Sequence, residues 1–272
     1  MSHSVVDLSA HINKTVEHGH PADFPVTLRP VFFEEDGVRR DVPRRFAVVR
    51  EDSGAPLGVV SDRYALVPHQ RILDTVEEAL KPLDLGPVSR GVYVDRGGAR
   101  MRAIFKFPTL SQAVADLDEI CPCLQIRNTY DGTTRITVHI GAFRFVCTNL
   151  AVGGGGVFAG GFMSVHAGEI PIDEVAHELV SYLSGFEAIV SLYQFWSSIR
   201  LQPTEIMSLL EPLPKRAAEE IRGKLPTHDV LTVYAAYNAA TWHATHQMRS
   251  HRTAFELLAH INRTFQERFP NS

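Results

Sequence analysis

Hydrophobic and polar residues alternate along several segments in the first half of the chain, and this period of two predicts β-strands. In segment 100–107 the apolar side chains share one face, and the other face carries Arg100, Arg102, Ile104 and Lys106. Turn signals at 96–98 and at Asp131-Gly132 predict antiparallel hairpins over 86–107 and 124–149. A third hairpin is predicted for 46–50 and 57–60.

Elsewhere the apolar residues recur with a helical period. The pattern predicts an early helix over 69–81, a long helix over 171–200, and shorter helices over 5–16, 111–120, 204–211, 214–223, 229–247 and 251–268. The fold class is therefore α+β: twisted antiparallel β-hairpins with one early helix, followed by an all-helical C-terminal half. We expect a β-rich region over 1–165 and a helical region over 166–272 packed on it as one structural unit.

The composition is that of an ordinary folded protein. The 272 residues are 44% hydrophobic, which excludes a disordered chain, and three Cys are too few for a disulfide scaffold. No apolar run is long enough to span a membrane, and the first residues do not resemble a signal peptide. We therefore expect a cytoplasmic protein with no membrane partner and with its cysteines reduced.

The charge is unevenly distributed. The whole chain has 27 Lys and Arg against 31 Asp and Glu, which argues against a generally basic nucleic-acid binder. Segments 38–50, 86–107 and 121–150, however, hold 13 Lys and Arg and only 3 Asp and Glu. A basic patch on an acidic body is one way for such a chain to bind polyanions.

The predicted strands offer a candidate surface for this binding. Cations on adjacent strands can follow the phosphates of a single strand, and the Arg guanidinium donates two hydrogen bonds to one phosphate. The candidate nucleic-acid-binding residues are Arg100, Arg102, Lys106, Arg127, Arg135, Arg144 and Asn149, with Tyr93, Tyr130 and Phe143 for base stacking. An ordinary solvated sheet face with the same charges is the alternative.

The residues with catalytic or metal-binding chemistry do not form a recognisable motif. His243 and His246 lie one helical turn apart and could share zinc with His166, His177 or a carboxylate, but no HExxH motif is present. Cys147 shares a predicted face with Phe143, which favours a small buried side chain over a nucleophile. The glycines at 153–156 lack the Lys-Ser/Thr of a phosphate-binding loop. We predict no catalytic residues, no metal and no cofactor.

Three segments resemble a phage- and plasmid-borne protein family of unknown function. They are LGVVSDRYALVPHQRILD, the hairpin NTYDGTTRITVHIGAFRFVCTNLAV and the helix LTVYAAYNAATWHATH, which together span about residues 57–246. The matching positions in the last two are Asp131, Gly132, Arg144, Val146, Cys147, Asn149, Asn238, Thr241 and His246. The resemblance implies a setting in DNA metabolism, defence or counter-defence, but no specific activity.

The order of hairpins and helices is also similar, in layout alone, to the single-strand annealing proteins of phage recombination. That similarity implies a homo-oligomer, in the form of a ring, that binds single-stranded nucleic acid in a basic groove. Three hypotheses follow: a strand-annealing protein that binds single-stranded nucleic acid, a counter-defence or regulatory factor that binds a protein, and a metal-dependent enzyme that uses His243 and His246.

Overall fold

The computed structural model describes residues 21–271 except 116–117, 135, 145–149, 152–161, 166–171, 226–230 and 248–250. The helix expected at 5–16, Cys147, Asn149, His166 and the glycines at 153–156 lie outside the described residues. Strands fill the first part of this range and helices the last, so the α+β class is confirmed.

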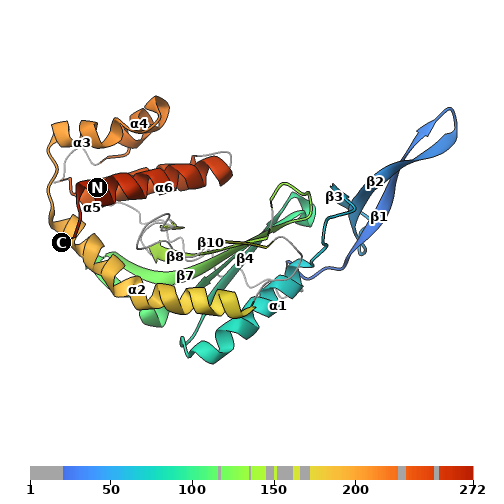
Figure 1. Ribbon diagram of the computed structural model, residues 1–272, viewed down its shortest axis with the longest axis horizontal. Helices are drawn as coiled ribbons and strands as arrows, with labels where there is room; N and C mark the ends of the chain where they lie inside the picture. The colour runs from blue at the N-terminus through green and yellow to red at the C-terminus, as the bar shows by residue number, and fades with distance from the viewer. Residues whose placement is uncertain are drawn as a thin grey trace, which may run out of the picture.

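A small sheet forms a projecting arm. Its strands are β1 (Val26–Glu35), β2 (Val38–Arg50) and β3 (Pro56–Ser61), in the order β1-β2-β3 and all antiparallel. The predicted hairpin at 46–60 is present, but β1 and β2 extend it into a long two-stranded ribbon. In Figure 1 this ribbon points away from the rest of the molecule.

A larger sheet follows the arm along the chain. Its main path is β10-β8-β7-β5-β4, with β6 beside β7 and β9 beside β8. The strands are β4 (Ser89–Asp95), β5 (Arg100–Lys106), β6 (Gln112–Ala115), β7 (Asp118–Thr129), β8 (Ile136–Arg144), β9 (Leu150–Ala151) and β10 (Phe162–Val165). The predicted hairpins are therefore β4/β5 and β7/β8, except that 145–149 lie outside the described residues. The acidic helix expected at 111–120 is wrong, because Gln112–Ala115 pairs with β7 as strand β6 and the residues from Asp118 onward belong to β7 itself.

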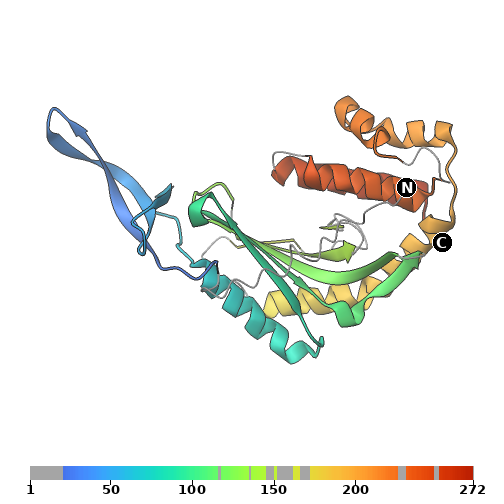
Figure 2. The ribbon, with the colours of Figure 1, turned by 180° about the vertical axis from the view of Figure 1, so that it is seen from behind.

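Helices lie on opposite sides of this sheet. Figures 1 and 2 show α1 and α2 along one side and α6 on the other. The helices are α1 (His69–Leu80), α2 (Ile172–Ser198), α3 (Pro203–Leu210), α4 (Lys215–Arg222), α5 (Val233–His246) and α6 (His251–Arg268), close to the predicted bounds. Within the part of the chain that the structure describes, no helix is long and apolar enough to cross a membrane.

The main core joins one face of the large sheet to α1 and α2. Phe105, Leu124 and Ile126 contribute from the sheet, and each is at most 1% exposed. Leu73 of α1 and Phe186 of α2 belong to the same cluster. Burial of this apolar face fixes the orientation of β5, β7 and β8 and leaves their intervening residues on the opposite face.

A second cluster of rings joins α2, α5 and α6. Trp196, Tyr237 and Phe265 lie with their ring centroids 5.1 to 5.8 Å apart. The Tyr237 hydroxyl donates to Asn262 Oδ1 at 2.6 Å and lies 3.1 Å from the hydroxyl of Tyr193. These hydrogen bonds satisfy polar groups in a buried aromatic core, so the helices pack in one specific arrangement.

Candidate functional site

The face of the large sheet opposite α1 and α2 carries a row of polar residues, one from each of four neighbouring strands. In the antiparallel register Arg102 of β5 lies opposite both Tyr93 of β4 and Arg127 of β7. Arg127 in turn lies opposite Thr137 of β8. We call Tyr93, Arg102, Arg127 and Thr137 the basic row. Directly opposed residues have Cα atoms about 4.5–5.5 Å apart, so the row brings two cations close together.

Among the residues that the structure describes, the two arginines of the basic row have no compensating carboxylate. Among the described residues neither Arg102 nor Arg127 takes part in an ion pair, and the buried Nε atom of Arg127 has no hydrogen-bond partner. Burial, and secondarily the charge of Arg102, lowers the pKa of Arg127 to about 10. Arg127 therefore remains a cation at neutral pH, and a bound anion would supply the partner that it lacks.

The two ends of the basic row add further binding groups. Tyr93 is 47% exposed, and the Arg102 guanidinium lies 5.2 Å from the centroid of its ring. Thr137 is buried, and its Oγ1 atom has no hydrogen-bond partner among the described residues. The row therefore presents an exposed aromatic ring and two cations, which are groups that bind a base and a phosphate, and the Thr137 hydroxyl lies buried beside them.

The structure does not place the other predicted binding residues in the basic row. Arg100 donates through Nε to Asp131 Oδ2 at 2.6 Å, so a carboxylate already neutralises it. Lys106 lies on the same face as Arg102, about 14 Å further along the strand, and burial lowers its pKa. The register pairs Arg144 with Ile120, at a position in line with Ala142 rather than with Thr137. Arg135 and Asn149 lie outside the described residues.

The difference at Arg144 has a simple cause. The sequence analysis places Arg144 among the binding residues, and this would require the alternation of β8 to change phase at Gly141. The β7/β8 pairing instead runs through Gly141 without a shift. Tyr130, expected to stack on bases, is fully buried and is unavailable for that role. Thr137 was not predicted, because its place in the row depends on the register between β7 and β8.

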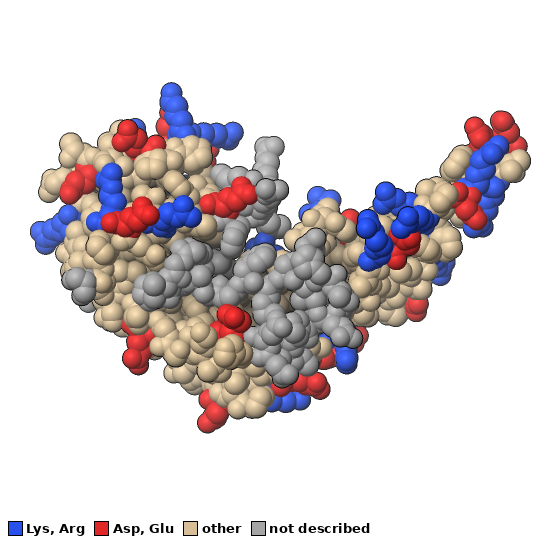
Figure 3. All heavy atoms as spheres, in the orientation of Figure 1, with Lys and Arg blue, Asp and Glu red and all other residues tan. Residues whose placement is uncertain are grey.

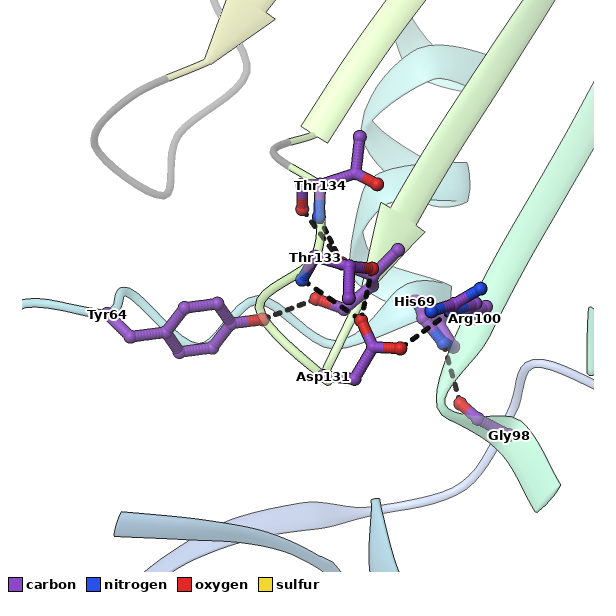
Figure 4. A network of polar contacts seen from close by, with 8 residues as sticks. Tyr64, His69, Gly98, Arg100, Asp131, Thr133 and Thr134 are labelled. Atoms are coloured by element: carbon purple, nitrogen blue, oxygen red, sulfur yellow. Dashed lines mark hydrogen bonds and ion pairs between the residues drawn. The ribbon is translucent and has the colours of Figure 1, made fainter. Parts of the chain in front are cut away.

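A polar network at the turn end of the sheet holds Arg100 (Figure 4). Asp131 accepts hydrogen bonds from the backbone N–H and side chain of Thr133 as well as from Arg100. The Tyr64 hydroxyl donates to the carbonyl oxygen of Thr129 at 2.8 Å. Segments far apart in the chain are therefore joined at the Asp131-Gly132 turn, and Arg100 serves this junction rather than the basic row.

His69 lies at the centre of this junction, and both nitrogens of its ring form hydrogen bonds. Its ring stacks on Tyr130 at 4.0 Å, and its backbone N–H donates to the Tyr130 hydroxyl. The ring Nε2–H donates to the carbonyl oxygen of Gly98, and Nδ1 accepts from Asn128. Burial lowers the pKa of His69 to about 4. A buried, neutral imidazole with both nitrogens bonded is a structural group rather than a general base.

Gly58 allows the first motif segment, LGVVSDRYALVPHQRILD, to approach the Asp131-Gly132 hairpin of the second. A Cβ atom at this position would lie 2.4 Å from Asp131 Cα, so only glycine lets β3 approach the turn. Gly58, Tyr64 and His69 all come from the segment LGVVSDRYALVPHQRILD, and their contacts reach the Asp131-Gly132 hairpin. The two motifs quoted from the sequence therefore form one structural junction.

Comparison with known proteins agrees with this junction. The model of the domain of unknown function DUF932 matches residues 56–269, which include all three motif segments. The chain belongs to the DUF932 family. Comparisons with curated proteins and with solved structures gave no match. The family is described as a domain of unknown function, so membership of DUF932 assigns no activity to the chain.

His243 of helix α5 does not form a metal site with other described residues, and the side chain of His246 lies outside the described part of the structure. His243 is 1% exposed, and its Nδ1 atom lies 3.3 Å from Glu220 Oε2. Burial lowers its pKa, although Glu220 opposes this shift. Across the described part of the chain no group of three or more His, Cys, Asp and Glu side chains could hold a metal ion. His177 is exposed on α2.

Replacement of Arg127 by Met should stabilise the free protein. Methionine has a similar length but needs no hydrogen-bond partner, so the cost of the buried Nε atom, which lacks a described partner, is removed. We expect the free energy of unfolding to rise by about 1–3 kcal/mol in urea titrations. The matched variant Arg102→Met, at an exposed position, should change it by no more than about 0.5 kcal/mol. A destabilised Arg127→Met protein would mean that Arg127 has a partner in the free state.

Protonation of His69 should destabilise the protein in mild acid. The pKa is about 4 in the folded protein and about 6.5 in the unfolded chain, so the unfolded chain takes up the proton first as pH falls. The contribution to stability is complete above pH 6.5 and falls by roughly 3 kcal/mol as the pH drops toward 4. The His69→Gln variant should lose this part of the pH dependence in urea titrations. The exposed control His177→Gln should keep it.

Proposed function

We propose that this DUF932 protein binds single-stranded nucleic acid through the basic row. The observation that carries the proposal is the direct opposition of Arg102 and Arg127 without a carboxylate partner among the described residues. Two adjacent like charges repel each other, so the arrangement is favourable only when an anion is bound. Nucleic-acid phosphates supply such anions at every nucleotide.

The surroundings of the basic row favour a single strand over a duplex. The exposed ring of Tyr93 lies beside Arg102 and provides a stacking surface for an unpaired base. A base in a duplex is stacked on its neighbours and cannot use this surface. The arginines would contact phosphates and the Tyr93 ring would stack on any base, so neither kind of contact distinguishes bases. We therefore expect binding with little dependence on sequence.

A role in strand annealing or recombination extends this proposal. It draws support from the resemblance to phage and plasmid proteins and from the similarity of layout to annealing proteins, and no catalytic residue is required. The protein-binding hypothesis is favoured by one separate feature. The side chains of Phe32 and Phe33, at the tip of the arm, are about half exposed. The metal-enzyme hypothesis has no such support, because His243 already faces Glu220.

Removal of both cations of the basic row should abolish most of the binding. We expect the double variant Arg102→Ala/Arg127→Met to bind a fluorescently labelled oligothymidine roughly 100-fold more weakly, because two charge-assisted contacts are lost. The slope of log affinity against log salt concentration should flatten by about 0.7 for each lost contact. Fluorescence anisotropy at several salt concentrations measures both quantities.

The control is Arg216→Ala, which removes one cation from the exposed surface of α4. It should leave the affinity within about twofold of the wild type, because an exposed charge far from the ligand is screened by salt. Equal affinities of the double variant and the wild type would exclude the basic row as the binding surface. Absence of wild-type binding at low salt would contradict the proposed function itself.

A further inference from the structure

The middle of the arm carries three exposed arginines that have no carboxylate partner among the described residues. They are Arg29 of β1, Arg45 of β2 and Arg63, which lies two residues beyond the end of β3. We call these three residues the arm patch. The other arginines of the arm each form an ion pair with a nearby carboxylate: Arg39 with Asp41, Arg40 with Glu35, Arg44 with Asp62 and Arg50 with Asp52. The arm patch is therefore the part of the arm where positive charge is not compensated by a described residue.

The strand register places two of these arginines on the outward face of the arm. Arg29 lies opposite Ala47, and Arg45 is two residues from Ala47 along β2, so both side chains lie on the same side of the sheet. The intervening residue Val48 lies on the other side and is fully buried in the cluster at the base of the arm. Figure 3 shows basic side chains gathered over the middle of the arm.

The carboxylate next to the arm patch is already neutralised. Asp62 precedes Arg63 in the chain, and it accepts hydrogen bonds from Arg44 Nε at 2.7 Å and from Arg44 Nη2 at 3.4 Å. These hydrogen bonds lower the pKa of Asp62, so the pair is fully ionised at neutral pH. The outward residues of β3, Val59 and Ser61, carry no charge. The surroundings of the arm patch therefore leave its positive charge available to a ligand.

A bulge in β2 produces this division of roles between two consecutive arginines. Residues 42–45 lie opposite Val31 of β1 alone, because the register between the two strands shifts at this point. Arg44 lies within the bulge with a φ of 59°, a left-handed conformation that is unfavourable for a residue with a side chain. Its guanidinium turns to Asp62, whereas Arg45 resumes the regular strand on the outward face.

The arm patch begins close to the basic row. Tyr64 follows Arg63 directly, and the Tyr64 hydroxyl donates to the carbonyl oxygen of Thr129 at 2.8 Å. Thr129 is two residues from Arg127 along β7. The Cα atoms of Arg63 and Arg127 are therefore no more than about 20–25 Å apart. A strand with stacked bases advances by about 3.4 Å per nucleotide, so about seven nucleotides span the distance.

We propose that the arm patch is a second phosphate-binding surface, which binds the backbone of the same single strand beyond the basic row. This inference rests on the proposed function, because it takes the same nucleic acid as the ligand. Each guanidinium can donate two hydrogen bonds to one phosphate. Glu34 and Asp36 at the tip make no ion pair with a described residue and would repel phosphates, so the strand follows the middle of the arm and not its tip.

Fluorescence anisotropy with a labelled oligothymidine long enough to reach both surfaces tests this inference. The arm variant Arg29→Ala/Arg45→Ala/Arg63→Ala should bind roughly 10-fold more weakly at low salt, and the slope of log affinity against log salt concentration should flatten by about 0.7 for each lost contact. All three positions are exposed, and circular dichroism checks that the variant folds.

The matched control removes the same number of exposed cations from α4 and α6. The variant Lys215→Ala/Arg222→Ala/Arg263→Ala should bind within about twofold of the wild type, because charges far from the ligand are screened by salt.

A gain of binding adds an independent test. The variant Ser61→Arg places a further cation opposite Arg45 and should strengthen binding about threefold. The variant Met207→Arg adds the same charge at an exposed position of α3 and should leave the affinity unchanged.

The outcomes separate this inference from the proposed function. An arm variant that binds like the wild type, beside a weakened Arg102→Ala/Arg127→Met variant, would overturn the inference and leave the proposed function intact. A weakened arm variant beside an unaffected Arg102→Ala/Arg127→Met variant would contradict the proposed function and not the phosphate-binding role of the arm patch. Polyglutamate that competes as well as the oligonucleotide at equal charge would overturn the phosphate assignment in favour of an acidic protein.

Discussion

The register between β5, β7 and β8 determines which side chains share each face of the large sheet. Burial of Phe105, Leu124 and Ile126 against α1 and α2 holds this register, because a slip by one residue would move that apolar set to the other face. The same constraint forces Arg102 opposite Arg127. The two arginines are therefore neighbours because the core places them there, even though their own interaction is repulsive.

The residues that stabilise the fold are different from the residues to which we assign binding. The apolar face, the aromatic cluster of α2, α5 and α6, and the His69 junction all have satisfied contacts. The basic row keeps a buried guanidinium nitrogen and a buried hydroxyl without described hydrogen-bond partners, and so do Asn238 and His243 of α5. The basic row differs because two cations, Arg102 and Arg127, lie directly opposite each other with no carboxylate partner among the described residues, and this is the physical reason for proposing binding there.

The sequence predicts the fold class and most elements, because period-2 and helical patterns are local signals. The sequence does not predict the basic row, because the register between β7 and β8 depends on the length of the turn that joins them. A two-residue turn at Asp131-Gly132 would pair Arg127 with Ile136, whereas the longer connection pairs it with Thr137. The contacts of His69 with Gly98 and Tyr130 link residues far apart in the chain, and no local pattern encodes them. At 111–120 pairing with β7 overrides the helical pattern.

The location of the bound strand tests the central claim most directly. An oligonucleotide that contains 5-iodouridine can be photo-cross-linked to the protein, and the modified peptides can be identified by mass spectrometry. Because Tyr93 is the exposed ring beside Arg102, the account predicts cross-links at Tyr93 that disappear in Arg102→Ala/Arg127→Met. Cross-links confined to the arm or to α3 and α4, with none on β4, would contradict it.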